Sequence, residues 1–319
     1  MTILVTGATG FIGSWVVRAL RQRELSFVMT DLTRDFTRLG LLVDDVERLP
    51  FVEADITSPS AIENMLFRYD VDRIIHLAAL QIPQCRADPV AGAAVNVTGF
   101  LRVFEAVKKK GDVKNVVYAS SAAVFGPPSI YGGGPVGEDV VLKPTTHYGA
   151  FKVCNELTAN AYWFELGISS VGLRPHTVYG FGRDVGVTAD VTRAIRAAIL
   201  GSPFKIRFGG IVALQYVADV AEAFVRCSLS DLRGARVYNL RGEVVEVAEV
   251  VKMIHRLIPS SEKLITFEDA PLPIAADLDD TAFRREVGGP PPTPVEEGLR
   301  ETIQIYEKLR ARGQLSIER

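Results

Sequence analysis

Apolar and polar positions follow two rhythms along the first 180 residues of the chain. Short runs rich in β-branched residues predict strands, whereas longer stretches with apolar residues three or four positions apart predict helices. Val90, Ala94 and Val97, for example, lie near helical spacing. The predicted strands are Ile3–Thr6, Ser26–Asp31, Arg73–Leu77, Asn115–Ser120 and Ser169–Arg174, and the predicted helices are Phe11–Arg23, Pro89–Lys110 and His147–Leu166.

The order of these elements predicts an α/β fold with a doubly wound parallel sheet, because strands that alternate with helices of this length form parallel βαβ units. After Gly180 the rhythm changes, and residues 181–319 are expected to form a smaller substrate-binding α/β region. Its late strand is expected to return to the sheet of residues 1–180. The elements predicted in this second region are helices Val191–Leu200, Val217–Ser228, Ala248–Leu257 and Pro294–Arg312, and strand Arg236–Leu240.

A glycine motif follows the first predicted strand, where residues 6–13 read TGATGFIG. Gly7 permits a tight turn, Gly10 lets the backbone approach a pyrophosphate, and Gly13 allows the helix to pack closely on the strand. The helix that begins at Phe11 and Ile12 then offers unpaired N–H groups to the phosphates. Residues 1–180 are therefore predicted to be a Rossmann-like dinucleotide-binding domain.

An acidic residue ends the second predicted strand. Asp31 lies eighteen residues after Gly13, where a carboxylate accepts hydrogen bonds from both ribose hydroxyls of NAD and repels the 2′-phosphate of NADP. We therefore expect NAD as the cofactor. Arg34 lies three residues further on and would favour NADP, so that alternative stays open.

The bulk composition excludes several classes of protein. With 48% hydrophobic residues, 23% charged residues and a net charge of −2, the chain gives no electrostatic reason to bind nucleic acid or an anionic membrane. We find no signal peptide and no apolar run long enough to span a bilayer. Cys85, Cys154 and Cys227 lie far apart without metal-ligand spacing, so no metal is expected, and the location is predicted to be cytoplasmic.

Tyr148 and Lys152 are the leading candidates for the chemistry, because their spacing puts both on one face of a predicted helix. A tyrosine hydroxyl has a pKa near 10, and a nearby cation lowers that pKa toward neutrality. Tyr148 can then act as general acid or base, with Lys152 as its electrostatic tuner. Ser121 follows a predicted strand, at the edge of a parallel sheet where ligands bind, and can hydrogen-bond a substrate hydroxyl.

With these motifs in place, the sequence resembles the extended short-chain dehydrogenases/reductases, also called the NAD-dependent epimerase/dehydratase family. The ordered series of matches covers about two-thirds of the chain. It comprises Thr6–Gly13, Asp31, Asp55-Ile56, His76–Ala79, Asn96–Gly99, Ser120–Gly126, Tyr148–Lys152, Arg174-Pro175, Tyr179-Gly180, Tyr216-Val217 and Asp219–Ala221.

The resemblance implies a role for each matched position. Ser121 would be the catalytic Ser/Thr, and Tyr148 and Lys152 would be the catalytic pair, which also touches the cofactor. The other matched residues would bind or support the NAD site: Asp55 and Ile56 at the adenine, Leu77, Ala78 and Ala79 along the cofactor backbone, Asn96 behind the active-site helix, Ser120 at the strand end, and Pro175 and Val178 at the nicotinamide.

Two departures from the family pattern bear on the reaction. Family dehydratases usually carry an Asp-Glu pair after the catalytic Ser/Thr, and here Ala122 and Ala123 stand there, so dehydration is disfavoured. Nucleotide-sugar epimerases usually carry an arginine before the Tyr-Val segment that binds the diphosphate, and residues 210–216 contain none. Arg207 and Arg183 remain as substitutes outside the motif.

We therefore favour net oxidoreduction at a carbinol carbon of a small polar substrate, such as a sugar, sugar acid, lactone or hydroxy acid. The alternatives are an NAD-dependent sugar or nucleotide-sugar epimerase with tightly bound NAD, and a catalytically silent NAD sensor. A homodimer is expected, because the helices over 89–110 and 147–166 carry apolar residues on more than one face. One face must cover the sheet, and the other can pair across a two-fold axis. Examples of these apolar residues are Val95, Phe100, Phe151, Tyr162 and Trp163. The substrate-contact candidates are Ser121, Ala122, His147, His176, Arg183 and Gln215.

Overall fold

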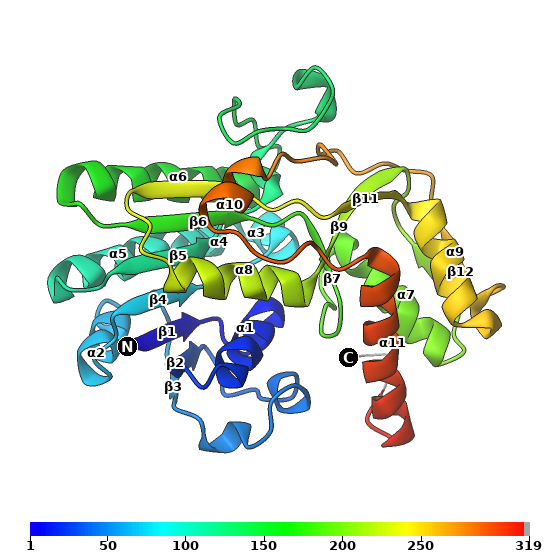
Figure 1. Ribbon diagram of the computed structural model, residues 1–319, viewed down its shortest axis with the longest axis horizontal. Coiled ribbons are helices and arrows are strands. Elements are labelled where there is room, and N and C mark those ends of the chain that lie inside the picture. The colour runs from blue at the N-terminus through cyan, green and yellow to red at the C-terminus, as the bar shows by residue number, and fades with distance from the viewer. Residues whose placement is uncertain (316–319) are drawn as a thin grey trace.

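Seven parallel strands form the central sheet of the protein, described here for residues 1–315 from a computed structural model (Figure 1). The strand order is β10-β6-β5-β4-β1-β2-β3, with the switch in winding direction between β1 and β4. The strands are β1 (Thr2–Thr6), β2 (Ser26–Asp31), β3 (Phe51–Glu53), β4 (Arg73–His76), β5 (Asn115–Ala119), β6 (Ser170–Arg174) and β10 (Ala235–Asn239).

Helices cover both faces of this sheet, because successive side chains of each strand point to opposite sides. Along β1, Ile3 and Val5 join the core beneath α1 (Phe11–Gln22) and α8 (Val217–Leu229). Leu4 joins the second core, beneath α2, α5 and α6. The predicted doubly wound, Rossmann-like sheet is confirmed. The helices of the second face are α2 (Ala61–Arg68), α5 (Gly99–Lys110) and α6 (His147–Leu166).

The predicted helix over residues 89–110 contains an interruption. It consists of α4 (Pro89–Ala93), a π turn over Ala94–Thr98, and α5. By length and composition this stretch could cross a membrane, so the expectation that no apolar run is long enough was wrong. Its apolar face is covered within the protein, since Phe100, Val103, Phe104 and Val107 are buried in the second core.

The same core accounts for two of the apolar residues named on these helices. Phe100 is 1% exposed and packs against Tyr118, and Tyr162 packs against Phe104 and donates a hydrogen bond to Glu105. Both therefore lie on the side of the helices that packs within the protomer, and the homodimer stays a prediction. Val95, Phe151 and Trp163 are half-buried.

The C-terminal region adds two small sheets and four helices beside the large sheet (Figure 1). Its core is continuous with that of the first face, since Tyr179, Val191 and Leu299 belong to the same cluster as Val5 and Trp15. Here β9 pairs parallel with β7 and antiparallel with β11, and β8 pairs with β12. The elements are β7 (Thr177–Tyr179), β8 (Phe204–Ile206), β9 (Ile211–Tyr216), β11 (Glu243–Glu246), β12 (Ile265–Phe267), α7 (Asp190–Ile199), α9 (Val247–Leu257), α10 (Thr281–Glu286) and α11 (Val295–Ala311).

Candidate active site

The glycine motif forms a tight loop between β1 and α1. Gly7 has φ +68°, and a Cβ there would lie 2.7 Å from the backbone N of Ala78. A Cβ on Gly13 would lie 2.0 Å from the carbonyl oxygen of Gly7. Only glycine fits both positions, because the loop, the first turn of α1 and the end of β4 are pressed together. Leu77 and Ala78 are fixed from the same side, since both backbone N–H groups donate to the Thr6 hydroxyl.

The start of α1 suits a cofactor diphosphate. Gly10 is the N-cap residue, and no side chain caps the helix, so its first N–H groups are left for a ligand. The first turn, which contains Phe11 and Ile12, carries no acidic residue that would compete with phosphate. These features fit the family's NAD.

Asp31 lies at the carboxyl end of β2, next to the glycine loop. Its Oδ2 accepts hydrogen bonds from Thr9 N at 3.0 Å and from Thr9 Oγ1 at 2.7 Å. Arg34, the residue that would favour NADP, is held elsewhere, because its guanidinium pairs with Glu47 at 3.0 Å and lies over Phe36. A carboxylate and no free cation at the strand end match a cofactor without a 2′-phosphate.

The predicted adenine residues lie further along the same sheet edge. Asp55 is exposed, and its Oδ1 accepts hydrogen bonds from the backbone and hydroxyl of Thr57. Ile56 is buried and faces α5 so closely that a Cβ on Gly99 would lie 2.8 Å from its Cδ1. Ala79 is half-buried after Ala78.

The start of α6 brings Tyr148 next to Ser121. Thr146 caps the helix by accepting a hydrogen bond from Gly149 N, and a Cβ on Gly149 would lie 2.2 Å from the Ala123 carbonyl oxygen. This close approach lets Ser121 form a side-chain hydrogen bond with Tyr148. Lys152 is buried on the same helix, with Nζ 5.4 Å from the centre of the Tyr148 ring and 2.6 Å from the Ala119 carbonyl oxygen.

Burial controls the protonation of this group. It raises the pKa of Tyr148 above 10, and the Ser121 hydrogen bond and the charge of Arg183 oppose that rise. It lowers the pKa of Lys152 to about 8, so the ammonium is still favoured at pH 7. The sequence named Lys152 as the cation that lowers the pKa of Tyr148, whereas in the structure the cation with that effect is Arg183.

Ser120 points away from Ser121, into a buried ion pair. Its hydroxyl donates to Glu156, which Arg174 binds through two hydrogen bonds of 2.8 and 2.7 Å. Both charged side chains are about 95% covered. Ser120 therefore anchors β5 to α6 and β6, and its hydroxyl is already occupied by this network.

Asn96 and the segment after β6 support the site without facing it directly. The Asn96 side chain accepts from Leu80 N at 2.7 Å and donates to Leu80 O at 2.8 Å, which fixes the chain just beyond Ala79. Pro175 O accepts from Ala122 N at 2.9 Å, and Val178 is buried in β7. The structure thus gathers Ala122, Pro175 and Ser121 at one sheet edge.

The polar substrate candidates are distributed over three places. His147 is exposed at the start of α6, where its ring stacks on Phe151. His176 is held by Thr177 and by the Ala275 carbonyl, and burial lowers its pKa. Gln215 joins the His176 backbone to the Leu240 carbonyl, so its amide is engaged in the fold.

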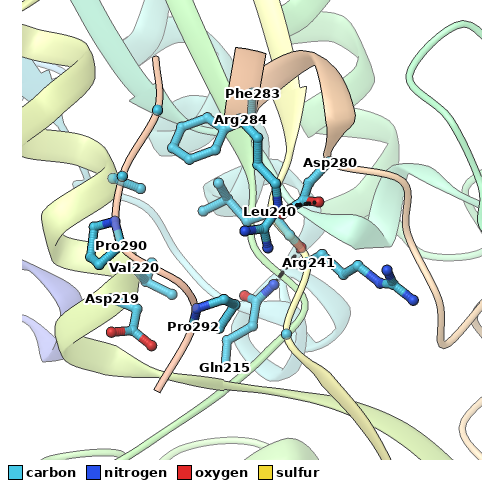
Figure 2. Close-up of a pocket in the computed structure, with 14 residues that line it drawn as sticks. Gln215, Asp219, Val220, Leu240, Arg241, Asp280, Phe283, Arg284, Pro290 and Pro292 are labelled. Atoms are coloured by element: carbon cyan, nitrogen blue, oxygen red, sulfur yellow. Dashed lines mark hydrogen bonds and ion pairs between the residues drawn. The ribbon is translucent and has the colours of Figure 1, made fainter. Parts of the chain in front are cut away.

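Gln215 also lines a small cleft of about 70 Å³ between β9, α8 and α10 (Figure 2). The two arginines of this cleft are neutralised, because Arg241 pairs with Asp277 and Arg284 pairs with Asp280. None of the three catalytic candidates lines it. A second hollow lies beside the start of α6, lined by Ile82, Arg86, Pro144, Thr145, Thr146, His147 and Ala150.

Three residues were not singled out as site residues by the sequence. His76 is buried and hydrogen-bonded to Thr6 at 2.7 Å, and burial together with the Lys152 charge lowers its pKa to about 3. Gln81 binds Arg183 at 3.3 Å, and Glu156 holds Arg174. Only His76 lay within a quoted motif, and its contacts depend on strand register, which no local pattern reveals.

Comparison with known proteins decides the family. The model of the NAD dependent epimerase/dehydratase family matches residues 3–240. The chain belongs to this family. It is accordingly an NAD-dependent enzyme of the extended short-chain dehydrogenase/reductase type.

The chain is similar in sequence to epimerases, and it shares its fold with dehydrogenases. The UDP-glucose 4-epimerase of Mycolicibacterium smegmatis is 31% identical over 317 residues, covering 96% of this chain and 98% of that protein. The UDP-glucose 4-epimerase of Thermus thermophilus, solved with NAD, superposes with a TM-score of 0.82 at 27% identity, covering 96% of this chain and 99% of that one. The L-threonine dehydrogenase of Clostridium difficile gives 0.85 at 21% identity, covering 99% of each chain, which is a likeness of fold alone.

Proposed function

We propose that this enzyme oxidises or reduces a carbinol carbon of a small polar substrate such as a sugar, sugar acid, lactone or hydroxy acid, and exchanges its cofactor in each turnover. The observation that carries the choice of substrate is the state of Arg207. Its guanidinium makes two hydrogen bonds of 2.7 Å with Asp190, so it does not supply a free cation for a nucleotide diphosphate. Residues 210–216 supply none either.

The three catalytic candidates divide the proton chemistry between them. When bound, NAD takes up or returns the hydride of the carbinol carbon. In the reducing direction, protonated Tyr148 donates the proton that the new hydroxyl needs. In the oxidising direction Tyr148 must first lose its proton, which the Ser121 hydrogen bond and Arg183 favour. Ser121 holds the substrate oxygen, and Lys152 adds positive charge beside the ring.

The test is direct. Purified protein with NAD is assayed for the absorbance of NADH across sugars, aldonates, lactones and hydroxy acids. Stoichiometric NADH formation with one of them supports net oxidoreduction. Silence across the panel, with conversion of UDP-glucose to UDP-galactose in the absence of added NAD, contradicts it.

That second outcome would support the runner-up, an epimerase that retains its NAD. The relative from Mycolicibacterium smegmatis, at 31% identity over nearly the whole chain, favours this reading. A silent NAD sensor is the third reading. It is the least favoured, because a sensor has no need of Ser121 in contact with Tyr148.

We also propose a homodimer, located in the cytoplasm. Leu157 and Phe164 are 64% and 78% exposed and lie two turns apart on one face of α6, and Val90 at the start of α4 is 80% exposed. Such residues favour a partner helix across a two-fold axis. Light scattering at micromolar concentration should give about twice the 34.8 kDa of one chain, and a monomer mass would contradict the proposal.

A further inference from the structure

Arg183 is a half-buried cation whose hydrogen-bond partners are all neutral. Its Nη1 donates to Gln81 Oε1 at 3.3 Å and its Nη2 to Thr188 Oγ1 at 3.0 Å, while its Nε is buried without any hydrogen-bond partner. Within residues 1–315 no carboxylate lies at ion-pair distance from it, and the neighbouring Asp184 is paired with Arg38 at 2.7 Å. Burial lowers the pKa of Arg183, and the nearby charge of Asp184 opposes that shift without a direct contact. The guanidinium therefore has the means to bind an anion.

The position of the Arg183 guanidinium indicates which anion it can bind. Its Cζ lies 5.6 Å from the centre of the Phe11 ring, and Phe11 is the first residue of α1 after the glycine loop. The uncapped start of that helix is where a dinucleotide diphosphate binds. A helix end supplies only about half an elementary charge, so a diphosphate buried there needs a further cation.

The segment that carries Arg183 is fastened to the glycine loop at two other points. We call residues 180–186 the strap. Trp15 Nε1 in α1 donates to the Phe181 carbonyl at 3.0 Å, and Arg38 joins Thr9 O, at 3.0 Å, to Asp184. The strap bends at Gly180, Gly182 and Gly186, which have φ values of +127°, +92° and +90°.

The strap is also anchored in the core, since Phe181 is 5% exposed and its ring packs against Tyr306. Its backbone conformation at three positions is one that glycine alone adopts without strain. The strap therefore holds Arg183 in a fixed place beside the start of α1.

We propose that Arg183, held in place by the strap, is the side-chain cation that binds the cofactor's diphosphate. The proposal rests on NAD as the cofactor and not on the substrate. It can therefore fail while the proposed oxidoreduction stands.

Calorimetric titration of Arg183→Met tests it with three probes: NAD, ADP-ribose and adenosine. ADP-ribose carries the diphosphate without the nicotinamide, and adenosine lacks both. We expect NAD and ADP-ribose to bind on the order of 10- to 100-fold more weakly, as for the loss of hydrogen bonds to a charged group, and adenosine to bind as to the wild type. Arg233→Met is the matched control. It removes one exposed positive charge just before the first residue of β10, at the sheet edge opposite the cofactor loop, and should change none of the three affinities.

Unchanged ADP-ribose affinity in folded Arg183→Met would overturn the proposal and would leave two other roles. If the substrate's KM rises, Arg183 binds a substrate anion; if only the pH profile of kcat moves, it acts on Tyr148. Should the variant not fold, hydrogen exchange on the wild-type chain decides. ADP-ribose should slow exchange over residues 180–186 and adenosine should not, and equal exchange with both ligands would contradict the proposal.

Discussion

Two groups of buried charge lie one helical turn apart on α6, and they differ in whether their charges are balanced. Glu156 and Arg174 form a closed pair, completed by the Ser120 hydroxyl and about 95% covered. Lys152, four residues before Glu156, donates to a backbone carbonyl, and Arg183 beside Tyr148 binds an amide and a hydroxyl. In the closed pair, Glu156 and Arg174, each charge is compensated by the other. In the open group, Lys152 and Arg183, no carboxylate contacts the cation, so the negative charge of a ligand can compensate it.

The largest effect is expected on the open side, at Tyr148. Tyr148→Phe keeps the ring and removes the proton donor, so kcat should fall by about 10²- to 10⁴-fold while NAD affinity and the free energy of unfolding change little. Tyr162→Phe is the matched control, because it removes a hydroxyl from the same helix that binds only Glu105. Retention of more than about a tenth of the wild-type kcat by Tyr148→Phe would mean that another group, such as His147, moves the proton.

For the closed pair, Glu156 and Arg174, the expected effects are reversed: the free energy of unfolding falls and kcat changes little. Glu156→Gln leaves Arg174 as an uncompensated buried charge and should lower the free energy of unfolding by roughly 3–5 kcal/mol, measured with urea. The kcat of the molecules that remain folded should stay within a few-fold of wild type. Glu249→Gln breaks an exposed pair with Lys252 and should cost at most about 1 kcal/mol. A large loss of kcat without loss of stability in Glu156→Gln would show that Glu156 acts in the reaction and not only in the fold.

His76, which lies near Lys152 of the open group, makes the stability of the protein depend on pH. Its pKa is lowered from 6.5 to about 3 in the folded protein, first by burial and then by the Lys152 charge. The unfolded chain therefore binds a proton between these values that the folded chain does not bind, and stability must fall as the pH drops below 6.5. From pH 7 to pH 5 this residue should account for about 2 kcal/mol.

The measurement is urea unfolding at pH 7, 6 and 5 for the wild type and for His76→Asn. The variant has a lower baseline, but its decline with acid should be shallower by that amount. Parallel curves would show that His76 does not titrate in this range.

The smallest effect is expected at Asp31. Asp31→Asn weakens the hydrogen bonds that the ribose hydroxyls donate and removes the repulsion of a 2′-phosphate, so NAD affinity should fall about tenfold and the preference for NAD over NADP should narrow. The ratio of kcat/KM for the two cofactors reports this change. An unaltered ratio would locate the discrimination elsewhere.

The sequence predicted the elements and the site residues that depend on local pattern. The strand–glycine–helix order located the cofactor loop, and the spacing of Tyr148 and Lys152 placed both side chains on one side of α6. Strands β3, β7, β8, β9, β11 and β12 escaped prediction, because such short runs carry too little periodicity to identify a strand without flanking signals.

The sequence could not predict which arginines of the site are paired with carboxylates, because those contacts join residues far apart in the chain. Whether Arg207 and Arg183 are free depends on Asp190 and Asp184, and the decisive contact, between Arg38 and Asp184, spans 146 residues. Ser120 and Ser121 are neighbours in sequence, but only the turn of the chain after β5 sends one hydroxyl to Glu156 and leaves the other beside Tyr148.

The π turn over Ala94–Thr98 makes the helix unusually sensitive to its own length. It holds one surplus residue relative to a regular helix, and the Asn96 carbonyl there accepts a hydrogen bond from the Asn155 side chain of α6 at 2.9 Å. A deletion of a single residue in this turn would restore a continuous α-helix that looks more regular. It would also return the Asn96 carbonyl to the regular hydrogen-bond ladder of the helix, so the hydrogen bond that Asn155 donates to it from α6 would be lost. Within this helix, therefore, a deletion that improves the local geometry loosens the attachment to α6.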